Sequence, residues 1–139
     1  MNDPYLYDDC DVLKNKLGIR NSELLDIVEV NLSCAAIKRL ITSPTKGNYD
    51  FEHLRAYHKA IFEDIYEWAG DPRTVLIEKQ EAVIGYMSIE YAKPNNIESE
   101  AVVILQKMNN IIWSKLSLDE QAKGFKSIKD CNLTLRNIR

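Results

Sequence analysis

Apolar residues recur every three or four positions over several stretches of this chain, a spacing that is typical of amphipathic helices. The first stretch begins at Asn21 and Ser22, either of which can cap a helix through its side-chain oxygen. A segment at 43–48 that contains Pro and Gly then interrupts the pattern. We therefore predict a helix over 21–41 with an apolar stripe formed by Leu25, Val28, Leu32, Ala35, Ala36 and Leu40.

The same pattern predicts three further helices. Asp50 can cap a helix that runs through Trp68, and Pro94 opens another whose apolar stripe extends to Ile112. Ser117 and Glu120 have the spacing of a capping box, which predicts a last helix beginning near 118. Its inward residues would be Ala122, Phe125 and Ile128, and the final segment 129–139 is predicted to be an irregular tail.

Between the second and third of these helices the hydrophobic pattern changes. A short β-branched run at 74–77 is followed by polar residues at 79–81 and by a second apolar run at 82–87. This order predicts a β-hairpin. No repeat or long Gly/Ser linker divides the chain, so we expect one domain over 1–139 that is mainly α with a single β-hairpin.

Composition narrows the possible partners and the location. The 139 residues are 45% hydrophobic and 28% charged, as in a soluble globular domain, and the net charge of −3 disfavours nucleic acid as the partner. No apolar run approaches the roughly 20 residues that span a bilayer, and no secretory signal is visible. We therefore expect a cytoplasmic protein with neither a nucleic-acid nor a membrane partner.

The cysteines and histidines do not have the spacing of a metal site. The three cysteines are far apart and odd in number, which fits neither a disulfide framework nor a Cys-x-x-Cys pair. His53 and His58 are five residues apart and would lie on different faces of a helix. We predict no metal ligand in this chain and expect His58 to be a hydrogen-bonded, half-buried residue.

The segment around the predicted second helix carries a family resemblance. Phe-x-Asp-Ile-Tyr-Glu-Trp-Ala-Gly, at 62–70, is followed by Arg73-Thr74-Val75. This run resembles the scaffold that precedes the active site in Fic-domain proteins, which transfer AMP or a related group from a nucleotide to a target hydroxyl. Further segments that resemble the family follow the same order along the chain, at 3–7, 13–19, 49–58 and 87–94. The resemblance implies a Fic-like helical bundle.

The resemblance also implies a role for the hairpin. In Fic proteins it is called the flap, and its edge aligns an extended segment of the target by strand addition. Ile77, Glu78 and Lys79 match the flap's Ile-x-Lys, so Lys79 would lie near phosphate or target. Gln80 stands where the family usually has Gly. The competing interpretation is that Lys79 is an ordinary solvated turn residue.

The family's catalytic signature is missing from these residues. That signature, His-x-Phe-x-(Asp/Glu)-Gly-Asn-Gly-Arg, supplies a general base, a ligand for a divalent cation and a phosphate cradle. No His, Phe or Gly follows Phe125. We therefore expect a fold truncated before the motif-bearing loop, with no catalytic residue and no cofactor of its own, although the resemblance implies ATP and Mg for the intact family.

Two functions remain open from the sequence. One is the scaffold of a protein adenylyltransferase. The intact enzyme would transfer AMP from ATP to a Ser, Thr or Tyr hydroxyl, whereas we expect this chain alone to be inactive. The alternative is a non-catalytic interaction module that binds a protein partner through the flap. The partners we expect are a protein target or a small antitoxin-like protein. The chain could also self-associate through an exposed core.

Overall fold

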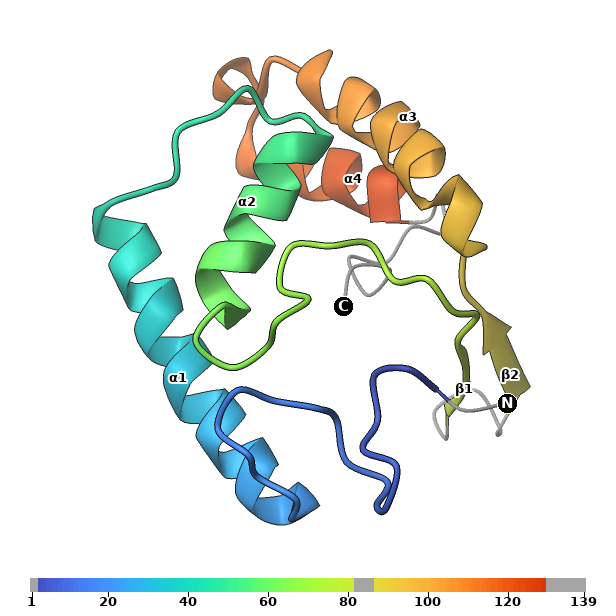
Figure 1. Cartoon of the computed structure of the whole chain (residues 1–139). Coiled ribbons are helices and arrows are strands. Elements are labelled where there is room, and N and C mark those ends of the chain that lie inside the picture. Colours follow the sequence, from blue (N-terminus) through green and yellow to red (C-terminus); the bar gives the residue numbers. More distant parts are fainter. Residues whose placement is uncertain (1–2, 82–86, 130–139) are drawn as a thin grey trace. The chain divides into compact units, whose positions relative to one another are not determined.

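The computed structural model describes residues 3–81 and 87–129, and only the backbone of 78–81, 87–90, 125 and 127–129. The chain is mainly helical (Figure 1), which confirms the predicted fold class. Its residues group into two compact units. The first contains the described residues up to Asn48 together with Glu52–Asp71, and the second contains Tyr49–Phe51 and the described residues from Pro72 onward. The prediction of one domain over 1–139 stays a prediction.

The first unit is built on α1 (Ser22–Thr42) and α2 (Phe51–Phe62). Asn21 caps α1 as predicted, because its side chain accepts a hydrogen bond from the backbone N–H of Leu24 at 2.8 Å. The core of this unit consists of Val12, Leu25, Ile65 and Tyr66. Of the predicted stripe on α1, Leu25 and Ala36 are buried, whereas Ala35 is exposed.

The predicted extension of α2 to Trp68 is wrong, since the helix ends at Phe62. The backbone N–H groups of Ile65 and Tyr66 both donate to the carbonyl of Phe62, which closes tight turns. The carbonyl of Ile65 accepts from the N–H of Lys16 at 2.8 Å, far away in the sequence. A continuing helix would need that carbonyl for its own ladder, so the contact with the N-terminal segment competes with further helix.

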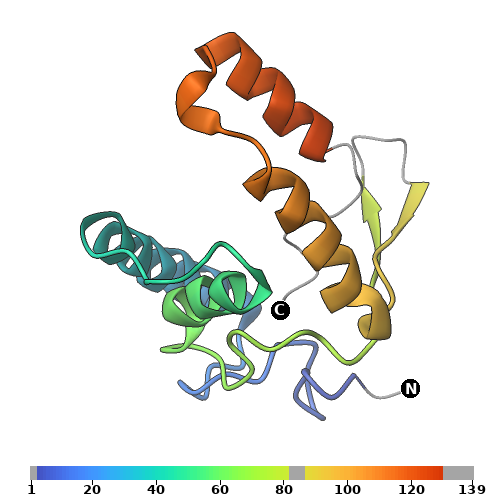
Figure 2. The same ribbon diagram turned by 90° about the horizontal axis from the view of Figure 1, so that it is seen from above.

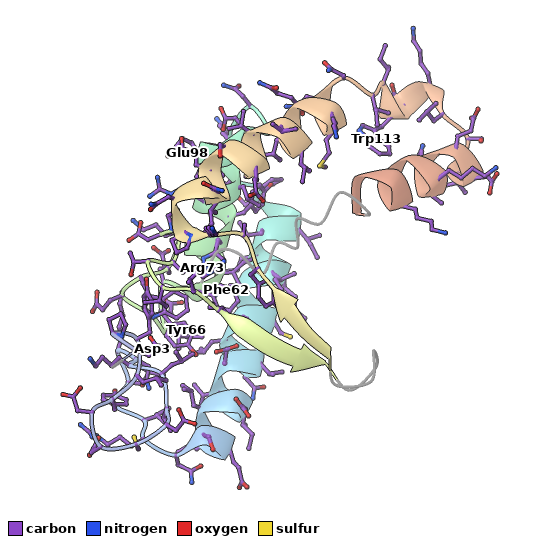
Figure 3. All side chains as sticks on the ribbon, turned by 90° about the vertical axis from the view of Figure 1, so that its right-hand side faces the viewer. Asp3, Phe62, Tyr66, Arg73, Glu98 and Trp113 are labelled. Carbon is purple, nitrogen blue, oxygen red and sulfur yellow. The ribbon has the colours of Figure 1, made fainter. Side chains whose placement is uncertain are left out.

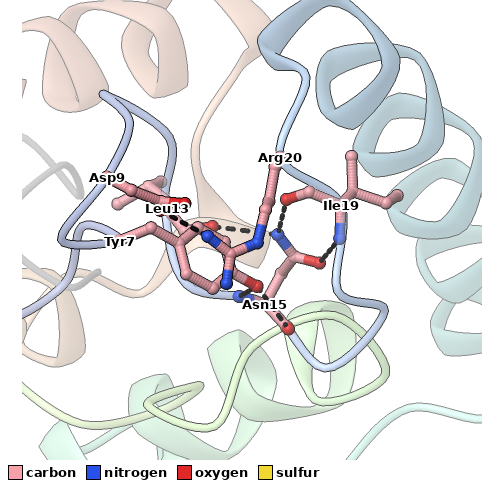
Figure 4. Close-up of polar contacts among 6 residues, drawn as sticks. All are labelled: Tyr7, Asp9, Leu13, Asn15, Ile19 and Arg20. Atoms are coloured by element: carbon pink, nitrogen blue, oxygen red, sulfur yellow. Dashed lines mark hydrogen bonds and ion pairs between the residues drawn. The ribbon is translucent and has the colours of Figure 1, made fainter.

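The N-terminal segment is irregular but closely hydrogen-bonded (Figure 4). The amide of Asn15 donates to the carbonyls of Leu13 and Ile19 at 2.9 and 2.7 Å and accepts from the N–H of Ile19. Arg20 lies 4.4 Å from the ring centre of Tyr7 and pairs with Asp9. These bonds replace a helical ladder, because one side chain satisfies several backbone groups at once.

The second unit contains the strands and the last two helices. Strands β1 (Glu78–Glu81) and β2 (Met87–Glu90) pair antiparallel, and the 3-10 turn η2 (Pro94–Asn96) leads into α3 (Ile97–Asn109). Figure 2 shows the chain reversing through η3 (Trp113–Lys115) into α4 (Leu118–Lys129). Helix α3 buries Ile97, Ala101 and Ile104 but ends three residues before the predicted Ile112, which is exposed.

The hairpin begins later than predicted. The predicted first strand at 74–77 is irregular, and the first strand starts at Glu78. One reason is that the carbonyl of Val75 accepts a hydrogen bond from the side chain of Arg73 and is not left for a strand ladder. The predicted second strand at 82–87 lies outside the described residues except for Met87, the first residue of β2.

The reversal between α3 and α4 is held by side-chain bonds to backbone. The indole N–H of Trp113 donates to the carbonyl of Met108 at 3.1 Å, and the amide of Gln121 donates to the carbonyls of Trp113 and Leu116 at 3.0 Å each. Among the predicted inward residues of the last helix, Ala122 is exposed instead, because Gln121 takes the position facing the reversal. The side chains of Phe125 and Ile128 lie outside the described part, as does the predicted tail apart from Lys129.

The capping box predicted at the start of α4 is present. The carboxylate of Glu120 accepts from the backbone N–H and from the hydroxyl of Ser117, each at 2.8 Å, while the N–H of Glu120 donates to that hydroxyl at 3.3 Å. The backbone bond from Ser117, followed by the hydroxyl bond, lowers the pKa of Glu120 below its ordinary value of 4.5. These bonds favour the ionised carboxylate.

This lowered pKa predicts a pH dependence at the start of α4. A carboxyl group with a lower pKa in the folded state stabilises the fold fully above its unfolded pKa and loses that contribution as the pH falls through the folded value. Acidification below pH 4.5 should therefore fray the first turn of α4, measured as a loss of amide-exchange protection at residues 118–121 relative to the intrinsic exchange rate at each pH. Glu120→Gln keeps an acceptor that does not titrate and should lose this acid step. An equal acid step in both proteins would contradict the assignment.

Candidate functional site

The predicted site residues lie where the hairpin begins. Ile77 is half-buried and directly precedes β1, while Glu78 and Lys79 are its first two residues. In the register of the sheet, Glu78 lies opposite Glu90 and Lys79 opposite Ile89. Two of the three residues therefore lie in one strand, and Ile77 lies just before it. The side chains of Glu78 and Lys79 lie outside the described part, so their contact with phosphate or target stays a prediction.

The base of the hairpin is held by the side chain of Arg73. Arg73 is only 1% exposed, and its two terminal nitrogens donate to the carbonyls of Val75 and Ala92 (Figure 3). Val75 precedes β1 and Ala92 follows β2, so one guanidinium joins the segment that enters the hairpin to the segment that leaves it. A planar guanidinium can reach two carbonyls at once, which the single charge of a lysine cannot do in the same way.

An open groove lies beside this base. It has a volume of about 350 Å³ and is lined by Thr74, Leu76, Lys93, Pro94, Asn95 and Asn96. Its lining combines two apolar side chains, a hydroxyl, one cation and two amides. Such a surface can accept the backbone and side chains of an extended peptide, because amides both donate and accept hydrogen bonds.

A cluster of rings stiffens the first unit behind α2. Tyr66 stacks on Trp68 with ring centres 4.3 Å apart, and Phe62 and His58 pack around them. Phe62 and Tyr66 are labelled in Figure 3. Tyr66 is 2% exposed, and its hydroxyl donates to the carboxylate of Glu29 on α1. This cluster packs the turns after α2 and ties them to α1, as expected of a scaffold.

Both histidines make structural hydrogen bonds. Nδ1 of His58 accepts from the backbone N–H of Gly70 at 2.9 Å, which places its ring proton on Nε2. Nε2 of His53 lies 2.8 Å from the carbonyl of Thr45 and donates to it. The prediction that His58 is half-buried and hydrogen-bonded is confirmed. Each ring therefore uses one nitrogen to hold backbone.

Two features are absent from the described residues. Among the described side chains, at 3–77, 91–124 and 126, no group of three His, Cys, Asp or Glu residues is placed to hold a metal ion. In the same part of the chain, no helix has the length and apolar character needed to cross a membrane.

Known proteins resemble this chain in sequence. It is 34% identical over 107 residues to the protein adenylyltransferase VbhT of Bartonella schoenbuchensis, which covers 77% of this chain and 21% of that protein. It is 33% identical over 101 residues to the probable protein adenylyltransferase y4lH of Sinorhizobium fredii, covering 73% of this chain and 47% of the relative. The chain therefore spans less than half the length of these relatives. No family model matches it.

Solved structures share its fold. An N-terminal Fic domain from Bartonella quintana with bound ADP superposes with a TM-score of 0.80 at 22% identity, covering 97% of this chain and 67% of that one. The protein BepC of Bartonella tribocorum with bound AMPPNP gives 0.76 at 21% identity, covering 94% and 67%. The fold is that of Fic domains. Together with the sequence matches, this confirms the predicted relationship: the chain is a Fic-family sequence.

Sequence reasoning missed the role of Arg73. In the sequence, the Arg-Thr-Val run is only part of a family pattern, and its position after Gly-Asp-Pro gives no sign of burial. An arginine is almost never fully buried unless it is paired, so exposure was the default expectation. The acceptors that pair it are backbone carbonyls, and these leave no mark in the sequence.

Proposed function

We propose that this chain supplies the scaffold and the target-aligning hairpin of a Fic protein adenylyltransferase. The whole protein would transfer AMP from ATP to a Ser, Thr or Tyr hydroxyl of a target protein, with Mg as the accompanying cation. The similarity to two adenylyltransferases over about three-quarters of the chain carries this proposal. The ADP and AMPPNP bound to proteins of the same fold support the use of a nucleotide. Because the reaction uses ATP, which is present in the cytoplasm, we place this activity there.

The hairpin would align the target by adding a strand to its edge. Strand addition gives affinity through backbone hydrogen bonds and leaves alternate side chains to set specificity. In this arrangement Ile77 and Lys79 would face one side of the sheet and Glu78 the other, because side chains alternate along a strand. The two hydrogen bonds from Arg73 support the proposal, since they fix the segments that enter and leave the hairpin at its base.

The 139 residues alone are proposed not to transfer AMP. No His-x-Phe-x-(Asp/Glu)-Gly-Asn-Gly-Arg sequence occurs among them, and both histidines bond to backbone. A base is required to remove the proton of the attacking hydroxyl.

Incubation with ATP labelled at the α-phosphate, Mg and candidate target proteins tests this proposal. Label on target should not exceed that seen with heat-denatured chain. An intact Fic protein assayed in parallel provides the positive control. Robust labelling by the 139 residues would overturn the proposed inactivity.

A second candidate function is a non-catalytic module that binds a protein partner, including a small antitoxin-like protein, through the hairpin. The groove beside the hairpin base favours this reading, because it offers amides and a cation without any catalytic group. A binding measurement with and without ATP distinguishes the two candidates. If the chain is a binding module, it should bind its partner with the same affinity with or without ATP. If it is the scaffold of the enzyme, its target should be modified only by the complete protein.

A further inference from the structure

We draw no further inference here: the strongest candidate, the exposed apolar face of α1 that carries Ile27, Val30, Ile37 and Ile41, supports no proposal because nothing in the described part of the structure shows what covers it.

Discussion

Replacing Arg73 by alanine is expected to lower the free energy of unfolding by about 3 kcal/mol, because two hydrogen bonds from a charged donor are lost together. The guanidinium is 1% exposed and donates to the carbonyls of Val75 and Ala92. Truncation leaves these acceptors without their donor and a cavity where the side chain was. Urea unfolding followed by circular dichroism measures the loss.

Arg73→Ala should also weaken the hairpin locally. Without Arg73, the segments before β1 and after β2 lose a shared hydrogen-bond donor, so amide exchange in β1 and β2 should accelerate more than in α1. Arg73→Lys keeps the charge but not the two-pronged reach and should recover only part of the stability. Arg20→Ala is the control, because its ion pair with Asp9 is exposed and contributes at most about 1 kcal/mol. Equal losses for Arg73→Ala and Arg20→Ala would contradict the assigned role.

Gly70→Ala is the second change with a large expected effect, a loss of about 3 kcal/mol in the free energy of unfolding. Gly70 has a φ of +88°, a region that favours glycine. A Cβ there would lie 3.0 Å from the carbonyl oxygen of Arg55 and 2.9 Å from Cβ of Lys59. The backbone of Gly70 also bonds to Nε of Arg55 and Nδ1 of His58, both at 2.8–2.9 Å, so any shift that relieves the contact weakens these bonds.

Gly18→Ala provides the matched control for this substitution. Gly18 also has a positive φ, +68°, but an added Cβ would meet nothing within 4 Å. Its loss should be about 1 kcal/mol, from backbone strain alone. Thermal unfolding of the two variants compares them directly, and the difference between them reports the crowding around Gly70. If Gly18→Ala proved as costly as Gly70→Ala, the contact with α2 would not be the reason.

The helix beginnings could be read from the sequence because local bonds fix them. Asn21 caps α1, and Ser117 with Glu120 caps α4, through side chains within three residues of the backbone they satisfy. The helix ends were harder. The predicted extension of α2 to Trp68 had the correct apolar spacing, but Lys16 takes the carbonyl of Ile65, and a bond across that distance in the sequence has no local signal.

The hairpin, too, was predicted in part from the sequence. The change in period predicts two strands in this region, and two antiparallel strands are present, but the first begins at Glu78 instead of Thr74. The shift depends on Arg73, whose side chain takes the carbonyl of Val75. The exposed second face of α1 was also hidden from the pattern. A stripe search finds one apolar face per helix and assigns it to the core, and only the packing shows which of two faces is left in water.

The sequence by itself determined the family, the mainly α fold class, the caps of α1 and α4, and the order of helices around a hairpin, since these follow from ordered family segments, short-range hydrogen bonds and hydrophobic period. The tertiary structure decided where α2 ends, where the hairpin begins, and that Arg73 is buried between two carbonyls. It also decided that both histidines hold backbone and that α1 keeps an apolar face in solvent. Most of these depend on groups distant in the chain that share a backbone acceptor or a buried surface, such as Lys16 with Ile65 and Arg73 with Ala92. The start of the hairpin depends on a side-chain bond over only two residues, from Arg73 to Val75, which the hydrophobic pattern does not record.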